Sequence, residues 1–326
     1  MTVATSLPDA QASRLAHFPV SLFAIVMGLS GLTIAWMKAH HVVGASADIA
    51  VVLRCIASAV FAFLLLAYTA KFLRHPEEVA AEIRHPVRLN FFPAISIGLI
   101  LLAISWAPDA PAAARWMWGA GAALHLGFTL FVMSSWLHHT HYTIQHANPA
   151  WFIPVVGNIL VPIAGVRFAP PDVSWFFFSI GIVYWLVLMT IVMYRLFFHE
   201  PLPARLTPTL FILIAPPAVG FLSYVSLTDG VDAFARILYF SALFLTLLLA
   251  SNAIRFVRLP FFISAWAYSF PLAAMTIATF EMSVRSGAGF YGVLAGGLLA
   301  LLTLLLALLA AKTIQAALQH RICVPE

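Results

Sequence analysis

Ten apolar runs, each about long enough to cross a bilayer as a helix, divide this chain of 326 residues. They cover residues 18–37, 49–73, 90–106, 116–137, 151–168, 174–198, 208–228, 232–256, 260–284 and 288–315. A hydrocarbon layer of roughly 30 Å needs about 20 apolar residues per helix, so the runs use nearly the whole sequence. Only 9% of the residues are charged, which excludes a soluble globular enzyme. We therefore predict an all-α integral membrane protein with ten transmembrane helices.

Little of the chain falls outside the apolar runs. We expect a short tail at residues 1–17, a single transmembrane domain at 18–315 and a second short tail at 316–326. The first residues lack the basic start and small-residue cleavage pattern of a removable signal sequence. The two cysteines are too few for a disulfide framework.

Lysine and arginine are distributed unevenly between the two sides of the predicted membrane domain. Of the 17 basic residues, eleven fall on the side that carries both termini. The other six are Lys38, Arg54, Arg115, Arg167, Arg236 and Arg285. Because cytoplasmic loops retain an excess of Lys and Arg during insertion, we predict a bacterial inner-membrane protein with both termini in the cytoplasm.

Proline is concentrated in the odd-numbered runs. Pro19 and Pro93 lie at or just inside the starts of the first and third runs. The prolines within the fifth, seventh and ninth runs are Pro154, Pro162, Pro216, Pro217 and Pro271, and the even runs contain none. Proline kinks a helix, and broken backbone at membrane depth is tolerated where it is buried or lines a cavity. This pattern predicts five tandem helical hairpins whose odd members surround a central path and whose even members face lipid. The alternative is a chance alternation, because proline is common in membrane helices.

The predicted inner helices carry small, neutral residues that could line a path for ions. The candidates for pore lining or for a helix break are Gly28, Ser30, Pro93, Ser96, Pro154, Gly157, Asn158, Pro216, Pro217, Ser269 and Pro271. Hydroxyl and amide groups can coordinate an ion without a fixed charge. Small residues equally allow helices to pack closely, which is the alternative for each of them.

Ionisable residues are scarce within the runs. Glu281, Arg54 and Arg236 lie near run ends, where their side chains are expected to snorkel to the interface. A transporter driven by buried carboxylates is therefore disfavoured. The basic excess at the terminal side, represented by the mouth charges Arg88, Arg255 and Arg258, would concentrate anions there. The same excess is also expected from membrane topology alone.

Histidines cluster after the fourth run, at His138, His139, His141 and His146. His138 and His141 would share a helix face as a possible metal pair. Because no Cys, Asp or Glu lies near them, a solvated loop is favoured and no metal is predicted. His125, in the middle of the fourth run, is expected to be a neutral packed side chain. The chain has no nucleotide-binding or nucleophile motif, so we expect no cofactor and no nucleic-acid partner.

Five stretches of sequence resemble one known family. The segment AWAYSFP at 265–271 resembles a ninth-helix motif, and HPVRLNFF at 85–92 resembles the entry to a third helix. Similar matches are Asn148-Pro149 with VVGN at 155–158 in the fifth helix, APPA at 215–218 in the seventh, and Asp232, Arg236 and ALF at 242–244 in the eighth. The family is that of the TehA-like tellurite-resistance and dicarboxylate transporters, which includes the slow anion channels of plant guard cells.

The resemblance implies quasi-fivefold symmetry, a pore lined by the odd helices and a homotrimer with one pore per subunit. It also implies that a phenylalanine of the ninth helix plugs the pore, and Phe270 is the matching residue here. A bulky apolar ring in a narrow neutral pore would expel water and so block ions. The neighbouring Pro271 would place the ring at a helix break, where local backbone freedom could assist its movement.

These observations lead to one expected function and two alternatives. We expect a passive channel or permease for small inorganic or organic anions in the lipid bilayer, gated by Phe270, and not an enzyme. The first alternative is a proton-coupled secondary transporter of a dicarboxylate such as malate, or of an oxyanion such as sulfite or tellurite. His125 or Glu281 would then carry the proton. The second alternative is a membrane-embedded enzyme that uses the 138–146 histidine loop.

Overall fold

The computed structural model describes residues 14–138 and 142–323, and within them all regular structure is helical. Ten helical spans in this part of the chain are long and apolar enough to cross a membrane. They are Val20–Val43, Ala47–Arg74, Arg88–Trp106, Pro111–His138, Pro149–Phe168, Pro171–Phe198, Thr207–Thr228, Ala233–Ala250, Ile263–Ser286 and Gly289–Leu318. Each overlaps one predicted run, so the prediction of ten transmembrane helices is confirmed.

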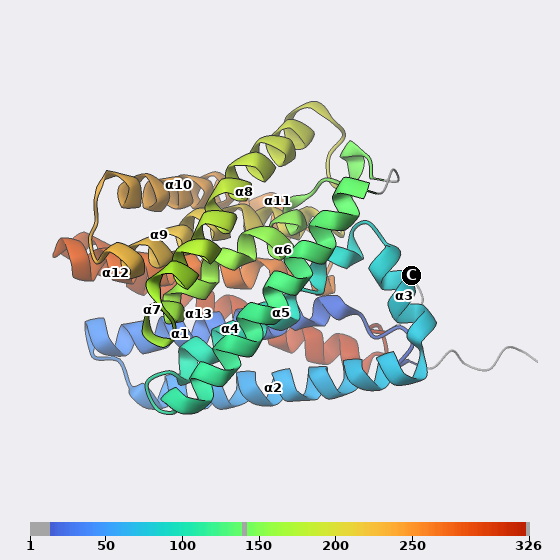
Figure 1. Ribbon diagram of the computed structural model, residues 1–326, viewed down its shortest axis with the longest axis horizontal. Coiled ribbons are helices and arrows are strands. Elements are labelled where there is room, and N and C mark those ends of the chain that lie inside the picture. Colours follow the sequence, from blue (N-terminus) through green and yellow to red (C-terminus); the bar gives the residue numbers. More distant parts are fainter. Residues whose placement is uncertain (1–13, 139–141, 324–326) are drawn as a thin grey trace, which may run out of the picture.

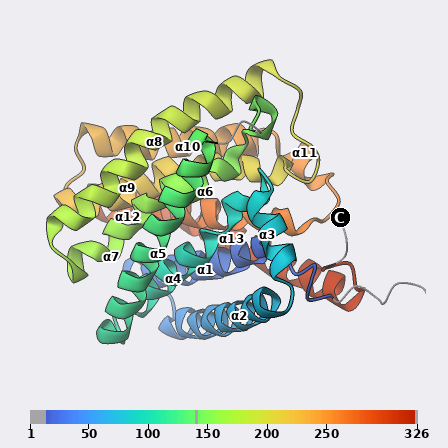
Figure 2. The same ribbon diagram turned by 45° about the vertical axis from the view of Figure 1, so that its right-hand side comes forward.

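The odd-numbered spans form the interior of the bundle and the even-numbered spans form its outside. Between 61 and 89% of the residues in the most apolar stretch of each odd span are buried, against 28 to 33% in each even span. Figure 1 and Figure 2 show two even spans, α2 (Ala47–Arg74) and α10 (Ala233–Ala250), on opposite sides of the bundle. This division is the one that the proline pattern predicts.

Even and odd spans also differ in their backbone. The even spans are the continuous helices α2, α5 (Pro111–His138), α8 (Pro171–Phe198), α10 and α13 (Gly289–Leu318). Every odd span combines an α-helix with 3₁₀ turns. These elements are η1 (Val20–Phe23) with α1 (Ala24–Val43), η2 (Arg88–Phe91) with α4 (Ala94–Trp106), η4 (Pro149–Trp151), α6 (Phe152–Val156), η5 (Gly157–Leu160) and α7 (Val161–Phe168), η6 (Thr207–Ile214) with α9 (Ala215–Thr228), and η7 (Ile263–Tyr268) with α12 (Ser269–Ser286).

The prolines explain where three of these changes from 3₁₀ to α geometry fall. Pro93 is the residue before α4, Pro216 and Pro217 lie in the first turn of α9, and Pro271 is the third residue of α12. Proline suits the first turn of an α-helix, because the N–H that it lacks would have no partner there. In the fifth span Pro154 lies within α6, and the backbone beyond it tightens into η5.

Consecutive spans pack as antiparallel neighbours, and the inner spans also contact one another in a closed series. Helix α1 packs against α4, α4 against α7, α7 against α9, α9 against α12, and α12 returns to α1. Gly28 lets α1 and α12 approach closely, because a Cβ added there would lie 2.3 Å from the Ser269 hydroxyl oxygen. Quasi-fivefold symmetry itself stays a prediction.

The structure differs from the predicted runs at two places: one predicted run is interrupted, and one connecting loop contains a helix. The eighth run, 232–256, breaks after α10, because the Ser251 hydroxyl and the Asn252 amide both donate to the Leu248 carbonyl, at 2.7 and 3.0 Å. Such side-chain bonds compete with helix continuation, and the short α11 (Ala253–Val257) follows. The loop between the second and third spans contains a helix, α3 (Pro76–Arg84). The remaining element is η3 (Ile144–His146).

Asp232, part of the eighth-helix motif, caps α10. Its carboxylate accepts hydrogen bonds from the Ala235 backbone N–H at 2.9 Å and from the Tyr224 hydroxyl at 2.6 Å. Both hydrogen bonds stabilise the ionised carboxylate and hold the pKa of Asp232 below its usual value. The bond from the Ala235 N–H has the larger effect. The motif residue therefore fixes the start of an outer helix and ties it to the seventh span.

Candidate functional site

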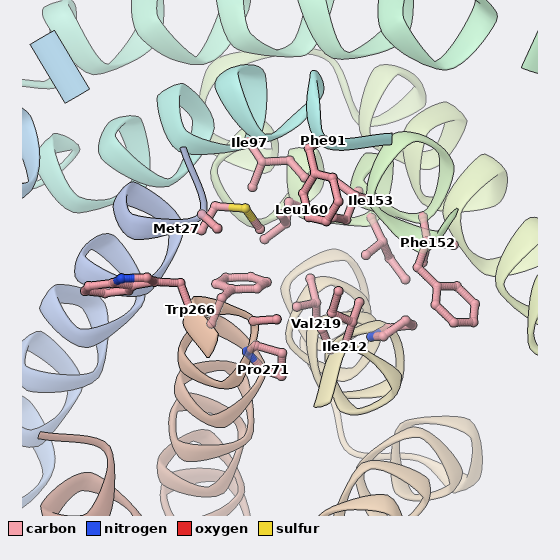
Figure 3. A pocket seen from close by; sticks show the side chains of 18 residues that line it. Met27, Phe91, Ile97, Phe152, Ile153, Leu160, Ile212, Val219, Trp266 and Pro271 are labelled. Carbon is pink, nitrogen blue, oxygen red and sulfur yellow. The ribbon is translucent and has the colours of Figure 1, made fainter. Parts of the chain in front are cut away.

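A small cavity of about 60 Å³ lies at the centre of the bundle, where all five odd spans meet. Its lining includes Ala24 and Met27 from the first span, Phe91 and Ile97 from the third, Phe152, Ile153, Val156, Gly157, Ile159 and Leu160 from the fifth, Ile212, Ala215, Pro216 and Val219 from the seventh, and Trp266, Ala267, Phe270 and Pro271 from the ninth. Figure 3 shows Met27, Ile97, Leu160 and Val219 directed toward a common space. We name this space the inner cavity.

The described residues around the inner cavity are all apolar or aromatic. Its volume could hold a few water molecules, but a water molecule needs polar partners to stay in such a space. Phe270 is 8% exposed, and its ring lies next to the first span, since a Cβ added at Gly31 would be 3.4 Å from it. The inner cavity can therefore act as a hydrophobic constriction, because ions do not cross a dewetted space.

A larger cavity of about 770 Å³ lies at the end of the bundle that carries both termini. It shares Ala24, Phe91 and Ala267 with the inner cavity, so the two adjoin. Segments near both ends of the described chain line it, including His17 and Ile322. We name it the vestibule.

Basic side chains exceed acidic ones around the vestibule. Its lining includes the basic residues Lys71, Arg88, Arg205, Lys312 and Arg321 and the acidic residues Glu78 and Glu82. A charged recess with low-dielectric walls concentrates counter-ions, so this recess favours anions next to the apolar constriction. Of the three predicted mouth charges, Arg88 lines the vestibule, whereas Arg255 and Arg258 are exposed outside it.

A comparison with known families identifies the chain's family. A family described as SLAC1, voltage-dependent anion channel, matches residues 17–314 of the chain. The chain belongs to the SLAC1 family. The resemblance carried by the ninth-helix segment is thereby confirmed, and the family comprises anion channels and transporters rather than enzymes.

Relatives of this SLAC1-family chain occur in archaea, plants and bacteria. An uncharacterised transporter of Methanocaldococcus jannaschii is 25% identical over 86% of this chain and 92% of its own length. The S-type anion channel SLAH2 of Arabidopsis thaliana is 29% identical over 82% of this chain but only 53% of its own length. The tellurite resistance protein TehA homologue of Haemophilus influenzae is 29% identical over 79% of each chain. The chain thus spans about half the length of the plant channel.

Three of the eleven predicted lining or helix-break residues lie on the inner cavity, namely Gly157, Pro216 and Pro271, and so does the predicted gate, Phe270. The others, Gly28, Ser30, Pro93, Ser96, Pro154, Asn158, Pro217 and Ser269, are outside its lining. Several satisfy their polar groups locally. The Ser96 hydroxyl donates to the Pro93 carbonyl at 2.8 Å, and the Ser269 hydroxyl donates to the Trp266 carbonyl at 2.6 Å. Both hydroxyls therefore bond to carbonyls of their own spans, which is consistent with the helix-packing alternative.

Most of the residues that line the inner cavity were not predicted from the sequence. Met27, Ile97 and Val219 are ordinary apolar residues within apolar runs, so nothing in their local sequence distinguishes a cavity-facing side chain from a packed one. Trp266 belongs to the ninth-helix segment, but only Phe270 of that segment was predicted to face the pore as its gate. The available signal was their position close to the helix breaks: Val219 follows Pro216 by three residues, and Trp266 precedes Pro271 by five.

His125 lies behind the inner cavity rather than on it. Its Nδ1 is 2.9 Å from the Ser96 hydroxyl oxygen, and its ring packs against Gly157, where an added Cβ would be 2.6 Å from both Cε1 and Nε2. Asn158 belongs to the same layer, since its amide donates to the Thr129 hydroxyl at 2.8 Å. Among the described residues, His125 Nε2 has no hydrogen-bond partner. The backbone of Gly157 thus separates a buried polar layer from the inner cavity.

Substituting Gly157 with alanine is expected to destabilise the protein, because the new methyl group would overlap the His125 ring and the Ile97 side chain. Overpacking of this kind costs about 1 to 3 kcal/mol. Gly297→Ala in α13 is the matched control, because no atom lies within 4 Å of a Cβ added there. The measurement is thermal unfolding of the purified variants in detergent. Equal stability of the two variants would contradict this packing.

Lys71 and Glu82 tie three segments together at the vestibule. The Lys71 Nζ lies 3.2 Å from the Glu82 carboxylate and donates to the Phe18 carbonyl at 2.9 Å. The Tyr68 hydroxyl donates to the same carboxylate at 2.6 Å. Lys71 is 1% exposed and Glu82 is 4% exposed. This cluster joins α2, α3 and the entry to the first span, so it holds the vestibule wall in place.

Two charged residues expected to snorkel are instead buried in ion pairs. Arg54 is 6% exposed, pairs with Asp109 and donates to the Ser105 carbonyl at 2.9 Å. Glu281 is 9% exposed and pairs with Lys38 and Arg285. Pairing and hydrogen bonding offset the cost of removing these charges from water. Arg236, by contrast, is exposed.

The histidine loop after the fourth span is only partly described, because His139 and His141 lie outside the described residues. The proposed pair of His138 with His141 therefore stays untested. Within the described residues, no group of three or more His, Cys, Asp or Glu side chains could hold a metal ion. His138 Nδ1 is 2.9 Å from the Ser134 carbonyl oxygen, which is a local helix contact.

Proposed function

We propose that this chain is a passive anion channel whose pathway runs from the vestibule through the inner cavity, with Phe270 closing the cavity. The observation that carries this proposal is the apolar lining contributed by all five inner spans, directly adjoining a basic recess. The vestibule attracts anions by its charge, and the inner cavity withholds them by excluding water. Family membership supports transport of anions.

The inner cavity also favours one class of anion. An ion that enters it must shed water, and the charging cost of leaving water rises with the square of the ionic charge. No charged side chain among the described lining residues compensates that cost. Monovalent, weakly hydrated anions such as nitrate should therefore cross more readily than a dianion such as malate at neutral pH.

The alternative of a proton-coupled transporter of a dicarboxylate or an oxyanion needs a proton carrier on the pathway. His125 lies behind Gly157, and Glu281 is held by two cations. Neither residue lines the inner cavity, which favours the channel.

Anion flux in liposomes tests the proposal. For the purified protein, we expect nitrate and chloride to move at least about tenfold faster than malate, which corresponds to a barrier difference of about 1.4 kcal/mol. The flux should follow the electrochemical gradient of the anion and be unaffected by an imposed pH gradient. Faster malate flux that an inward proton gradient drives would instead support the coupled transporter.

We also propose that the chain assembles as a homotrimer in a bacterial inner membrane, with both termini in the cytoplasm. The excess of basic residues on the terminal side supports this orientation. The trimer rests on the family resemblance.

A further inference from the structure

A cluster of charges lies at the end of the bundle opposite the termini. The two carboxylate oxygens of Glu281 contact different cations: one pairs with Lys38 of α1, and the other accepts a hydrogen bond from the Arg285 Nε at 2.6 Å. Arg285 also lies 3.4 Å from the carboxylate of Asp229, which follows α9. Three inner spans therefore meet at this cluster.

The cluster lies in line with the inner cavity. Met27 and Lys38 are eleven residues apart in α1, and Phe270 and Glu281 have the same spacing in α12. At 3.6 residues per turn, eleven residues make about three turns, so each pair shares a helix face with a separation of about 16 Å along the axis. Since Met27 and Phe270 line the inner cavity, the Lys38–Glu281 pair lies on the continuation of the cavity-lining faces of α1 and α12.

Glu281 occupies the place that an anion would take. Its side chain is 12% exposed, whereas those of Lys38 and Arg285 are 37% and 21% exposed. Two cations thus converge on one partly enclosed carboxylate, beyond the uncharged inner cavity and at the end of the bundle away from the vestibule. Amino and guanidinium groups in this arrangement suit a small carboxylate, nitrate or halide ion.

We propose that Lys38 and Arg285 form an anion-binding site at the far mouth of the pathway, and that the carboxylate of Glu281 occupies it as a tethered substitute for the permeating anion. The proposal rests on the proposed channel function. A monovalent anion that crosses the inner cavity from either side exchanges with the Glu281 carboxylate at this site. Glu281 therefore limits how strongly the far mouth attracts anions.

Glu281→Gln tests this site, because glutamine keeps the side-chain volume and removes the charge. The variant is made in the Phe270→Ala background, so that the apolar constriction is relieved, and is recorded in planar bilayers with potassium nitrate. Anion conductance should rise roughly three- to tenfold over the parent, because Lys38 loses its carboxylate partner and Arg285 keeps only the exposed Asp229, which raises the local anion concentration. The gain should disappear when the bath that faces this end of the bundle is raised to about 1 M salt, where the Debye length is about 3 Å. The same change in the opposite bath should leave the gain in place.

Two further variants separate this effect from a change in folding or in net charge. Asp48→Asn makes the same change in net charge at the same end of the bundle, on the exposed first turn of α2, and should leave the conductance unchanged. Adding Lys38→Gln to Glu281→Gln should remove most of the gain. If Glu281→Gln alone does not fold, Lys38→Gln alone should lower the conductance with the same dependence on salt in one bath.

The possible failures are distinguishable. Absence of any anion current from folded Phe270→Ala would contradict the channel function and the site together. A normal Phe270→Ala current that Glu281→Gln changes no more than Asp48→Asn does would overturn the anion site alone. Loss of flux in Glu281→Gln would also overturn it and would favour Glu281 as a proton carrier.

Discussion

Phe270→Ala is expected to raise the anion conductance of the reconstituted protein by at least about tenfold, equivalent to lowering the barrier by about 1.4 kcal/mol. The Phe270 ring is part of the apolar lining of the inner cavity, next to Gly31 of the first span. Removing the ring widens the cavity and lets water enter, so a permeating anion keeps more of its hydration. Current through planar bilayers, in symmetric chloride or nitrate, measures the effect.

Phe280→Ala is the matched control for this gating prediction. Phe280 lies in the same helix, α12, and is fully buried, but it does not line the inner cavity. Both substitutions remove one buried ring, so each is expected to cost about 3 to 5 kcal/mol of stability. Only Phe270→Ala should increase the current. Unchanged current from correctly folded Phe270→Ala protein would refute the gating role.

Lys71→Met is expected to lower the free energy of unfolding by about 3 kcal/mol, because it leaves the Glu82 carboxylate buried without its charged partner. The Tyr68 hydroxyl bond at 2.6 Å remains, but it supplies no positive charge. The loss should loosen α3 and the entry to the first span, both of which the cluster holds. Thermal or denaturant unfolding in detergent measures it.

The double variant Lys71→Met with Glu82→Gln tests whether the pair itself is the cause. Because it removes both charges, it should be within about 1 kcal/mol of the wild type. Lys312→Met, an exposed lysine on the same vestibule, should change stability little. Equal destabilisation by the single and the double variant would show that Lys71 acts through packing of its aliphatic chain instead.

Much of the fold was predictable because its rules are local. A helix that crosses lipid must pair its backbone N–H and C=O groups within itself and expose apolar side chains. The ten apolar runs therefore correspond to ten spans. Proline acts on the turn in which it stands, so the positions of Pro93, Pro216 and Pro271 marked the broken inner helices. The ninth-helix segment likewise marked Phe270, which lies on the inner cavity.

The polar candidates were less predictable, because a small polar residue has two uses in a membrane helix. Ser96 and Ser269 bond within their own helices, and Gly28 brings α1 and α12 together. Which use applies depends on the direction of the side chain relative to neighbouring helices. Helix rotation and crossing angle set that direction, and neither is encoded in a single run.

By itself, the sequence determined the number of spans, their division into inner and outer helices, and the membership of Phe270 in a recognisable segment. Only the tertiary structure decided that Met27, Ile97 and Val219 form the constriction and that the vestibule adjoins it. It also decided that Lys38 pairs with Glu281, 243 positions away in the sequence. The physical reason is the sequence separation over which each effect acts. Hydropathy and proline act on a few neighbouring residues, whereas ion pairs and cavities form where helices distant in the sequence meet, and the packing of those helices fixes where they meet.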